Sequence, residues 1–358
     1  MFAAESLPRQ WFIGEKLIKE EAIMNKASVV NWKGMPVVEL KAGGYTAMIA
    51  NEIGSNVIRL HDDVNGIEFF RHTADVTPEI IKGSTEVWGL PNLYLPNRLA
   101  DGVLRTSDAV YQLPINEKAP YNNHIHFILQ KRCHRLTELC SDETKAFAKT
   151  EYIFDENDEF YQYLPIKFKA EFCFTLSENG LEHRVRFTNL SNVMMPMSFA
   201  THTAMSSPFV DGGKQEDIRM KAPICEKWTL NERCLPTGDI LPLDDYDMEY
   251  KNGTKCPVLV NVDNDMYSAG SQEHDGRDFH GIIMMDKAQG KGIAYEVSNE
   301  YGFWIMWNDK GFNGYFCPEP MTAMIDAPNL DMPREQTGYC EVAPGESYEM
   351  WQKFRTIM

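Results

Sequence analysis

Two segments of the chain carry the side chains that proton transfer requires. Glu319 lies between Pro318 and Pro320, and because proline fixes its own backbone and restricts the residue before it, this carboxylate is held rigidly. His202 lies in the segment 198–208 among small hydroxyl residues. An unperturbed imidazole titrates near ~6.5, so it can give and take a proton near neutral pH. The two side chains suit general acid–base chemistry, and the alternatives are a turn-capping glutamate and a structural histidine.

Arg98 ends a loop that contains two prolines. Pro91 and Pro96 cannot both lie inside a central strand, so residues 89–98 are predicted to form a structured loop. The loop presents the guanidinium of Arg98, which has five hydrogen-bond donors in one plane. These donors could hold the oxygen atoms of a ligand, and the alternative is an arginine that is simply solvated.

The segment 122–126 contains two histidines, His124 and His126. If the segment is a strand, both imidazoles point the same way, because residues two apart share one face. Such a pair could bind a metal, donate hydrogen bonds to a ligand oxygen, or be structural. Metal-binding β-barrels commonly carry a glutamate a few residues further on, whereas Phe-Ile-Leu-Gln follows here at 127–130, which disfavours a metal site.

The elements that must position these side chains are mostly strands. From Val37 onward, short β-branched or aromatic segments alternate with Gly, Asn and Asp, which is typical of antiparallel strands joined by turns. The predicted fold class is all-β, a single large antiparallel sandwich over residues 31–358. Residues 1–30 are predicted to form an extension with a short helix at 15–22, and the one later helical pattern is at 78–82. We predict strands over residues 37–41, 45–50, 56–60, 66–70, 125–129, 161–163, 166–176, 182–187, 282–285, 292–297, 302–307 and 348–354.

The composition argues against several classes of partner. The 358 residues include 35 Lys and Arg against 52 Asp and Glu, a net charge of −17, which disfavours nucleic acid and anionic membranes. The eight cysteines form no Cys-x-x-Cys pair, so neither a zinc ribbon nor a redox dithiol is indicated. There is no apolar run of about 18 residues and no secretory signal pattern, so we expect a cytoplasmic protein with reduced thiols.

Taken in order, these segments resemble the aldose 1-epimerase (galactose mutarotase-like) family, from about residue 34 to residue 358. Each motif is weak alone, but seven occur in the family's order. The motifs are Gly-Ser-Asn-Val-Ile-Arg-Leu at 54–60, Pro-Asn-Arg at 96–98, Asn-His-Ile-His at 123–126, Thr-His at 201–202, Leu-Pro-Thr-Gly-Asp-Ile at 235–240, Cys-Pro-Glu-Pro at 317–320 and Ala-Pro-Gly-Glu at 343–346.

The resemblance implies a β-supersandwich whose cleft holds a small-molecule aldose. It implies that Glu319 is the general base at the anomeric hydroxyl and that His202 is the general acid at the ring oxygen. Asn97, Arg98 and His126 would bind the sugar and stabilise charge on its oxygen atoms. No metal or organic cofactor would be required, and the protein would be a monomer or a homodimer.

The chain departs from the family pattern beside both histidines. Phe127-Ile128 stands where Gly-Gly usually follows the first, and Ala204-Met205 where Tyr-Phe usually follows the second. Both changes affect substrate choice. By a looser alignment, the aspartate that usually contacts sugar hydroxyls would be Asp278 or Asp275. Three tryptophans could stack on a sugar ring or pack in the core, namely Trp88, Trp304 and Trp307.

Other functions remain open at this stage. The changes beside the two histidines would also fit a carbohydrate-binding protein without catalytic activity on the same fold. A hexose-6-phosphate 1-epimerase would need a basic phosphate site, for which one stretch offers Arg59, Arg71, Arg98 and Arg105, but the acidic balance ranks it lower. A metal-dependent β-barrel enzyme built on His124 and His126 ranks last.

Overall fold

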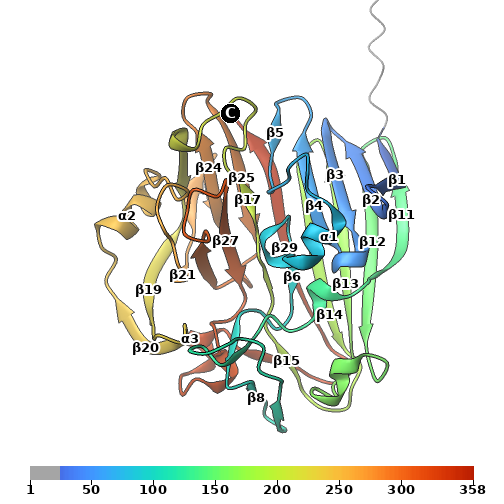
Figure 1. The fold of residues 1–358 in the computed structure, drawn as a ribbon, viewed down its shortest axis with the longest axis vertical. Coiled ribbons are helices and arrows are strands. Elements are labelled where there is room, and N and C mark those ends of the chain that lie inside the picture. The colour runs from blue at the N-terminus through green and yellow to red at the C-terminus, as the bar shows by residue number, and fades with distance from the viewer. Residues whose placement is uncertain (1–24) are drawn as a thin grey trace, which may run out of the picture.

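The computed structural model describes residues 25–358, which are built mainly of antiparallel strands in layers (Figure 1). This confirms the all-β sandwich. The helix expected at 15–22 lies outside the described residues. Within residues 25–358, none of the helices has the length and apolar character that a membrane span requires.

The large sheet is the most regular part of the fold. In the segment Phe168–Ser177 every second residue from Phe168 to Leu176 is buried, and the residues between them are partly exposed except for Glu171. The segment pairs in continuous register with both of its neighbours, and the next pairing, between Gly180–Asn189 and Ser347–Ile357, is also continuous. In spatial order, its strands are β11 (Arg135–Ser141), β12 (Lys145–Phe154), β13 (Phe168–Ser177), β14 (Gly180–Asn189), β29 (Ser347–Ile357), β25 (Lys291–Val297), β24 (Gly281–Asp286) and β18 (Ile218–Lys221).

A second eight-stranded sheet is shorter and irregular. Its register shifts on both sides of one strand, Ile224–Leu230, and another strand contains Pro318 and Pro320. In order, its strands are β20 (Pro236–Leu241), β19 (Ile224–Leu230), β21 (Asp265–Ala269), β26 (Phe303–Trp307), β27 (Tyr315–Met321), β16 (Ala200–Thr201) and β6 (Asn92–Leu93), with β17 (Met205–Ser206) pairing with β27 beside β16.

A third sheet of five strands begins the described chain and packs on the large sheet, where β2 contacts β12 and β13. It is blue in Figure 1, on the opposite side of the large sheet's β29 from the yellow and orange strands of the irregular sheet. Its strands are β1 (Lys26–Trp32), β2 (Met35–Ala42), β3 (Tyr45–Ala50), β4 (Asn56–Asp62) and β5 (Ile67–Glu68). Because β1 starts at Lys26, the sandwich begins before residue 31, and the predicted boundary of the extension was too late.

One apolar core joins the three sheets. It includes Leu40 from the five-stranded sheet, Phe172 from the large sheet, and Tyr267 and Met306 from the irregular sheet, all fully buried. The burial of this continuous apolar surface is the main driving force for the fold.

Smaller elements complete the chain. The helix expected at 78–82 is confirmed as α1 (Pro78–Gly83), which Thr77 caps at its N-terminus. The other elements are α2 (Asp245–Asn252), α3 (Arg334–Thr337), β7 (Arg98–Ala100) paired with β10 (Asn123–Ile125), β8 (Val103–Arg105) paired with β9 (Val110–Gln112), β15 (Met195–Met197) paired with β28 (Cys340–Val342), and β22 (Gln272–His274) paired with β23 (Arg277–Phe279).

Most strand predictions are confirmed, and two are wrong. Residues 125–129 leave β10 at Ile125 and turn, because His126 has the left-handed φ of 48°. Residues 161 and 162 belong to a 3-10 turn, Glu159–Gln162, which Asp158 caps through the N–H of Phe160, and Tyr163 is the residue that follows its end. Both segments are short and aromatic or apolar, so their composition alone does not distinguish a buried turn from a strand.

Candidate active site

Glu319 lies in the middle of β27, at a point where one neighbouring strand is interrupted. On one side, β26 pairs with β27 throughout, and Ile305 stands opposite Glu319. On the other side, β16 pairs only at Met321 and β17 only at Phe316 and Tyr315, so residues 317–320 have no strand partner there. Proline cannot donate to a ladder, so Pro318 and Pro320 are tolerated because their nitrogens can face this gap. The gap leaves room for a side chain beside the carboxylate.

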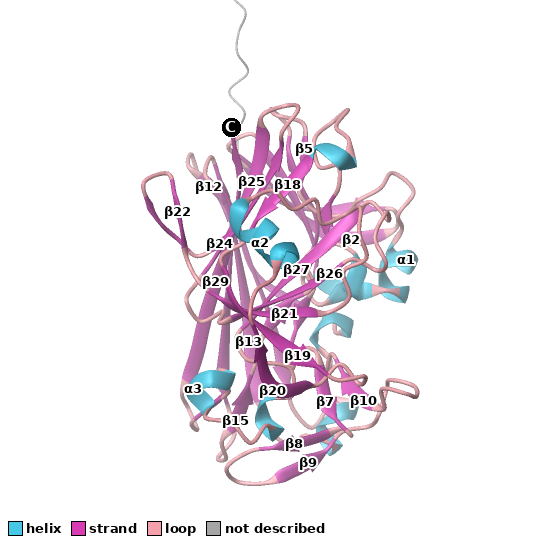
Figure 2. Ribbon diagram, turned by 90° about the vertical axis from the view of Figure 1, so that its left-hand side faces the viewer, coloured by secondary structure: helices cyan, strands magenta, loops and turns pink. Residues whose placement is uncertain are grey.

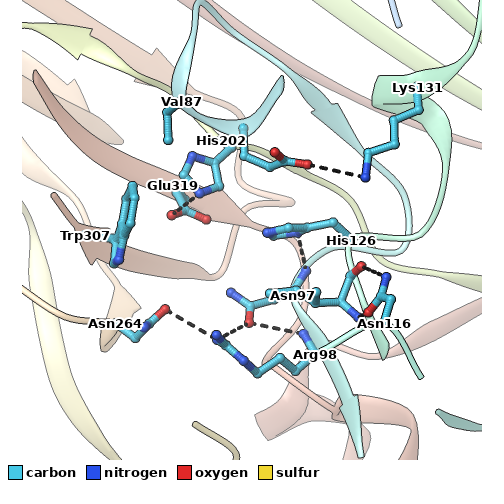
Figure 3. Close-up of a pocket in the computed structure, with 12 residues that line it drawn as sticks. Val87, Asn97, Arg98, Asn116, His126, Lys131, His202, Asn264, Trp307 and Glu319 are labelled. Atoms are coloured by element: carbon cyan, nitrogen blue, oxygen red, sulfur yellow. Dashed lines mark hydrogen bonds and ion pairs between the residues drawn. The ribbon is translucent and has the colours of Figure 1, made fainter. Parts of the chain in front are cut away.

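His202 fills that position. The chain from β16 runs on beside residues 89–93, where the N–H of His202 donates to the carbonyl of Pro91 at 3.2 Å and that of Ala204 donates to the carbonyl of Gly89 at 3.0 Å. The Nε2 atom of His202 lies 3.2 Å from Oε1 of Glu319 (Figure 3). The two side chains are 117 positions apart in the chain, and both are buried, at 6% and 3% exposure.

The ring of His202 has one hydrogen-bonding atom without a partner. Its Nδ1 atom is buried and contacts no donor or acceptor in residues 25–358. The ring is flanked by two other rings, with centroid distances of 5.7 Å to His126 and 5.5 Å to Trp307. A neutral imidazole carries a proton on one ring nitrogen and the imidazolium carries protons on both, so the state of Nδ1 depends on the form that the ring takes.

His126 and Asn97 form a second polar unit in the same cavity. The N–H of His126 donates to the carbonyl of Asn97 at 3.0 Å, and the N–H of Asn97 donates to Nδ1 of His126 at 3.1 Å. Because Nδ1 accepts, the proton of the neutral imidazole must lie on Nε2. In Figure 3 this ring points into the cavity that His202 and Glu319 also line.

The prediction that His124 and His126 share a face is wrong. His124 is the middle residue of β10, where it is buried, bonds through Nδ1 to the carbonyl of Pro114 at 2.6 Å, and packs on Phe127 and Phe160. His126 lies one residue beyond the strand, and its left-handed backbone turns the ring away from that packing. The pair is therefore not arranged as two ligands of one ion. Among residues 25–358, no three His, Cys, Asp or Glu side chains gather as a metal site.

Arg98 is buried and held by several acceptors. It begins β7, opposite Ile125 of β10. Its Nε atom donates to both carboxylate oxygens of Glu117 at 3.1 Å. One terminal nitrogen, Nη1, donates to the side-chain oxygens of Asn97 at 3.2 Å and Asn264 at 3.5 Å. The loop 89–98 therefore delivers its arginine into the cavity rather than to solvent, which decides between the two alternatives for this residue.

These side chains line one cavity of about 410 Å³ (Figure 3). It contains five of the six predicted site residues, namely Asn97, Arg98, His126, His202 and Glu319. The sequence had singled out Trp307 as one of three tryptophans that could stack on a sugar, and it is the one in the cavity, whereas Trp304 is fully buried in the core. The cavity also contains residues that the sequence analysis missed, namely Glu86, Asn116, Lys131 and Asn264.

The missed residues give no local signal. Glu86 lies in a 3-10 turn, Thr85–Val87, and Lys131 ends another, Leu129–Lys131, so each looks like an ordinary exposed charge in the sequence. The ammonium group of Lys131 lies 4.0 Å from the carboxylate of Glu86 at the rim of the cavity. Asn264 has a left-handed φ of 58° and precedes β21. Unusual backbone of this kind is common at functional sites, but a sequence does not reveal it.

Asp278 is the predicted site residue that the structure does not bring to the cavity. It lies exposed on β23, opposite Glu273 of β22. The β22–β23 hairpin projects on the far side of the molecule from β7 and β10 (Figure 2). Its alternative, Asp275, forms an ion pair with Arg355 at 2.8 Å. The loose alignment therefore assigned a residue of an exposed hairpin to the site. The polar side chain that lies beside Arg98 in the structure is the amide of Asn264.

Burial shifts the protonation of the two central side chains in opposite directions. Loss of hydration raises the pKa of Glu319 well above its usual 4.5, and Arg98 partly opposes this shift. Loss of hydration lowers the pKa of His202 from 6.5 to about 4, and the carboxylate of Glu86 partly opposes it. Both shifts disfavour the charged form of their group, so burial favours the state in which the one proton that the two groups can share lies on the carboxyl group and the imidazole is neutral.

Comparison with known proteins agrees with the fold and with the motifs. The family model described as aldose 1-epimerase matches residues 36–355. A galactose mutarotase-like protein from Clostridium acetobutylicum is 30% identical, with 93% of this chain and 99% of that chain covered and a TM-score of 0.89. Galactose 1-epimerase from Lactobacillus acidophilus is 13% identical, with coverage of 93% and 99% and a TM-score of 0.69. An aldose epimerase homologue from C. elegans is 14% identical, with coverage of 93% and 100% and a TM-score of 0.67.

Proposed function

The chain belongs to the aldose 1-epimerase family, and from this premise we propose that it interconverts the α and β anomers of a free aldohexose. The observation that carries the proposal is the contact between His202 and Glu319, 3.2 Å apart inside a cavity of about 410 Å³. Ring opening removes a proton from the anomeric hydroxyl and adds one to the ring oxygen. Both oxygens are bonded to the same carbon, so the base and the acid must also be close neighbours.

In the reacting form, the shared proton lies on His202 and Glu319 is a carboxylate. Glu319 accepts the proton of the anomeric hydroxyl while His202 gives its proton to the ring oxygen. The bond between the anomeric carbon and the ring oxygen breaks as the carbon–oxygen double bond of the aldehyde forms. Rotation about the neighbouring carbon–carbon bond presents the other face of the aldehyde. Closure then reverses both transfers and yields the other anomer.

This scheme never changes the total charge of the pair. In each half-reaction, one proton enters on one side chain and one leaves from the other. A buried site penalises net charge most strongly, so a reaction that conserves the charge of the pair suits the surroundings of Glu319 and His202. The opposite pKa shifts of the two groups support this proposal, because both favour the state with a single shared proton.

Asn97, Arg98 and His126 supply fixed hydrogen-bond donors. His126 has its proton on Nε2, because Nδ1 accepts from the backbone of Asn97. Arg98 cannot turn freely, since Glu117 holds its Nε atom at 3.1 Å. Donors that are oriented before the substrate arrives stabilise charge that develops on oxygen without further reorganisation. We assign these residues to binding the sugar and to stabilising its oxygen atoms during ring opening.

The charges around the cavity favour a neutral sugar over a phosphorylated one. The cationic side chains among its lining residues in the described structure are Arg98 and Lys131. Arg98 is paired with Glu117 at 3.1 Å, and Lys131 lies 4.0 Å from Glu86. A phosphate would have to compete with these carboxylates, whereas hydroxyl groups can bond to both partners of each pair.

Anomer equilibration of fresh α-D-glucose and α-D-galactose, followed by polarimetry, tests the proposal. We expect the protein to accelerate equilibration and both Glu319→Gln and His202→Asn to lose about 10²–10⁴-fold of the rate, the usual contribution of one acid or base. A matched control is Glu68→Gln, which removes a half-buried carboxyl group, one whose loss of hydration raises its pKa to about 7, from β5 outside the cavity. Wild-type rates in both site variants would refute the proposal. Saturable sugar binding without any acceleration would instead favour a carbohydrate-binding protein.

A further inference from the structure

The two residues beside His202 face the interior of the sandwich. Neighbours along an extended segment point to opposite sides, so Thr201 and Thr203 face away from the cavity that His202 lines. Both threonines are fully buried. A hydroxyl group without a partner is costly in such a place, so each must bond to a group of the core.

Their partner is a tyrosine of the large sheet. The hydroxyl of Tyr295, on β25, lies 3.0 Å from Oγ1 of Thr203 and 3.2 Å from Oγ1 of Thr201. It donates to Oε1 of Gln352, on β29, at 2.6 Å, and the hydroxyl of Thr201 donates to the same oxygen at 3.0 Å. These contacts join the strand that carries His202 to the opposite sheet through fully buried polar groups.

A histidine of the core sets the direction of these hydrogen bonds. The amide nitrogen of Gln352 lies 3.1 Å from Nδ1 of His183 and donates to it, which turns the amide oxygen toward Tyr295. His183 is stacked on Phe174, with ring centroids 4.7 Å apart. Burial lowers the pKa of His183 to about 3, so this ring stays neutral over the whole range in which the protein would work. The chain of donors and acceptors therefore keeps one orientation.

The imidazole of His202 lacks the support that a catalytic histidine usually has. A second group commonly bonds to the other ring nitrogen and fixes the orientation of the ring. Here Nδ1 of His202 is buried and has no partner in the described chain. The place of the ring is thus set by the rings that flank it and by its own backbone, and the backbone is held at both neighbours, Thr201 and Thr203.

We propose that Tyr295, with Gln352 behind it, is a positioning residue that holds the backbone on both sides of His202 and so keeps its imidazole aligned with Glu319. This inference rests on the proposed function for its catalytic consequence. Tyr295 does not touch the substrate. It acts directly through Thr203, and on Thr201 through the amide oxygen of Gln352 that both hydroxyl groups share. Because proton transfer depends steeply on distance and alignment, a displacement of about 1 Å at His202 is enough to slow the reaction about 10²-fold.

The test compares two tyrosines of the full-length protein. Tyr295→Phe removes the hydroxyl that accepts from Thr203 and that shares the amide oxygen of Gln352 with Thr201. Tyr301→Phe is the matched control, because Tyr301 is equally buried in the same core but its hydroxyl bonds to no other group within residues 25–358. We expect Tyr295→Phe to lower kcat about ten- to a hundred-fold with KM within about twofold, and Tyr301→Phe to leave both within about twofold. Equal kcat values in the two variants would overturn the inference.

Two further measurements separate positioning from general damage. Thr203→Ser keeps the hydroxyl and should retain most of the rate, whereas Thr203→Val should lose about as much as Tyr295→Phe. The pH titration of the His202 ring, followed by NMR, should change in Tyr295→Phe and not in Tyr301→Phe. The titration needs no turnover, so it tests the positioning of His202 even if the wild-type protein accelerates the equilibration of no aldose. A wild-type protein without activity would refute the proposed function but not this inference. Identical His202 titrations in both variants would overturn the inference.

Discussion

The two eight-stranded sheets differ in regularity, and the proposed catalytic pair lies on the irregular one. The large sheet has long strands such as β13, which pairs in continuous register on both sides and buries every second side chain from Phe168 to Leu176. The other sheet has register shifts along β19 and two prolines within β27. On one side of β27, the neighbouring strands β16 and β17 leave residues 317–320 without a strand partner. Glu319 and His202 meet at that interruption.

One histidine from each of the two sheets, His183 and His202, illustrates the same difference. His183 of the large sheet is stacked on Phe174 and bonds to Gln352, and burial lowers its pKa to about 3. It is neutral and structural. His202 is equally enclosed but lies 3.2 Å from a carboxyl group at the edge of a cavity. The role proposed for His202 therefore rests on its carboxyl partner and on its place in the cavity, not on its burial.

The largest expected effect separates activity from stability at Glu319. Glu319→Gln should lose about 10²–10⁴-fold in rate and yet raise the free energy of unfolding near neutral pH. In the wild type, burial raises the pKa of Glu319, so above pH ~4.5 the unfolded chain releases a proton that the folded protein keeps. That difference favours unfolding as the pH rises, and glutamine removes it. Thermal unfolding at pH 7 measures the gain, and a lower midpoint than wild type would contradict this account.

The reverse result is expected in the large sheet. Leu176 of β13 is fully buried in the core, opposite Ala146 and Leu181. Leu176→Ala should lower the free energy of unfolding by about 2–5 kcal/mol, from lost burial and the cavity left behind. Its kcat and KM, measured well below the unfolding temperature, should equal those of the wild type. A selective loss of kcat in the folded variant would show that the regular sheet takes a larger part in catalysis than proposed.

The pH profile of the rate should have a broad plateau with a fall on the acid side. Burial lowers the pKa of His202 from 6.5 to about 4, so below about pH 4 the pair takes up a second proton and Glu319 can no longer act as a base. The free energy of unfolding should also fall as the pH falls through this range. Between pH 6.5 and about 4, the unfolded chain binds a proton at His202 that the folded protein does not bind. Rates from pH 3 to pH 8 test this, and a fall already complete at pH 6 would mean that His202 keeps an ordinary pKa.

The smallest effect is expected at Asp278, the aspartate that the loose alignment assigned to sugar binding. It is exposed on the projecting β22–β23 hairpin, away from the cavity. Asp278→Ala should change the stability by no more than about 0.5 kcal/mol and leave KM unchanged. Asn264→Ala is the matching comparison. Because Asn264 lines the cavity, removal of its amide should raise KM. A raised KM in Asp278→Ala would instead restore the original assignment.

The sequence was sufficient to predict the regular parts of this protein. Strong alternation and turn residues identify strands such as β13 and β14, and ordered motifs identify five of the residues that line the cavity. It failed where backbone conformation decides the outcome. The left-handed turn at His126 ends β10 early, and the left-handed Asn264 brings an amide to Arg98. No local pattern of residue types signals either one.

Long-range contacts were the other limit. Glu86 and Lys131 lie on separate short turns, and only the folded chain brings them 4.0 Å apart at the cavity. The bonds of Thr203 to Tyr295 and of Thr201 to Gln352 both span more than ninety positions in the sequence. Pairings of this kind depend on tertiary packing, so a single sequence contains no periodic signal for them.

A crystal structure of the protein with bound D-galactose tests the central claim most directly. We expect a sugar in the cavity with its anomeric hydroxyl within about 2.6–3.2 Å of the Glu319 carboxylate and its ring oxygen equally close to Nε2 of His202. A sugar whose anomeric carbon lies instead beside Arg98 and Asn264, out of reach of both groups, would contradict it.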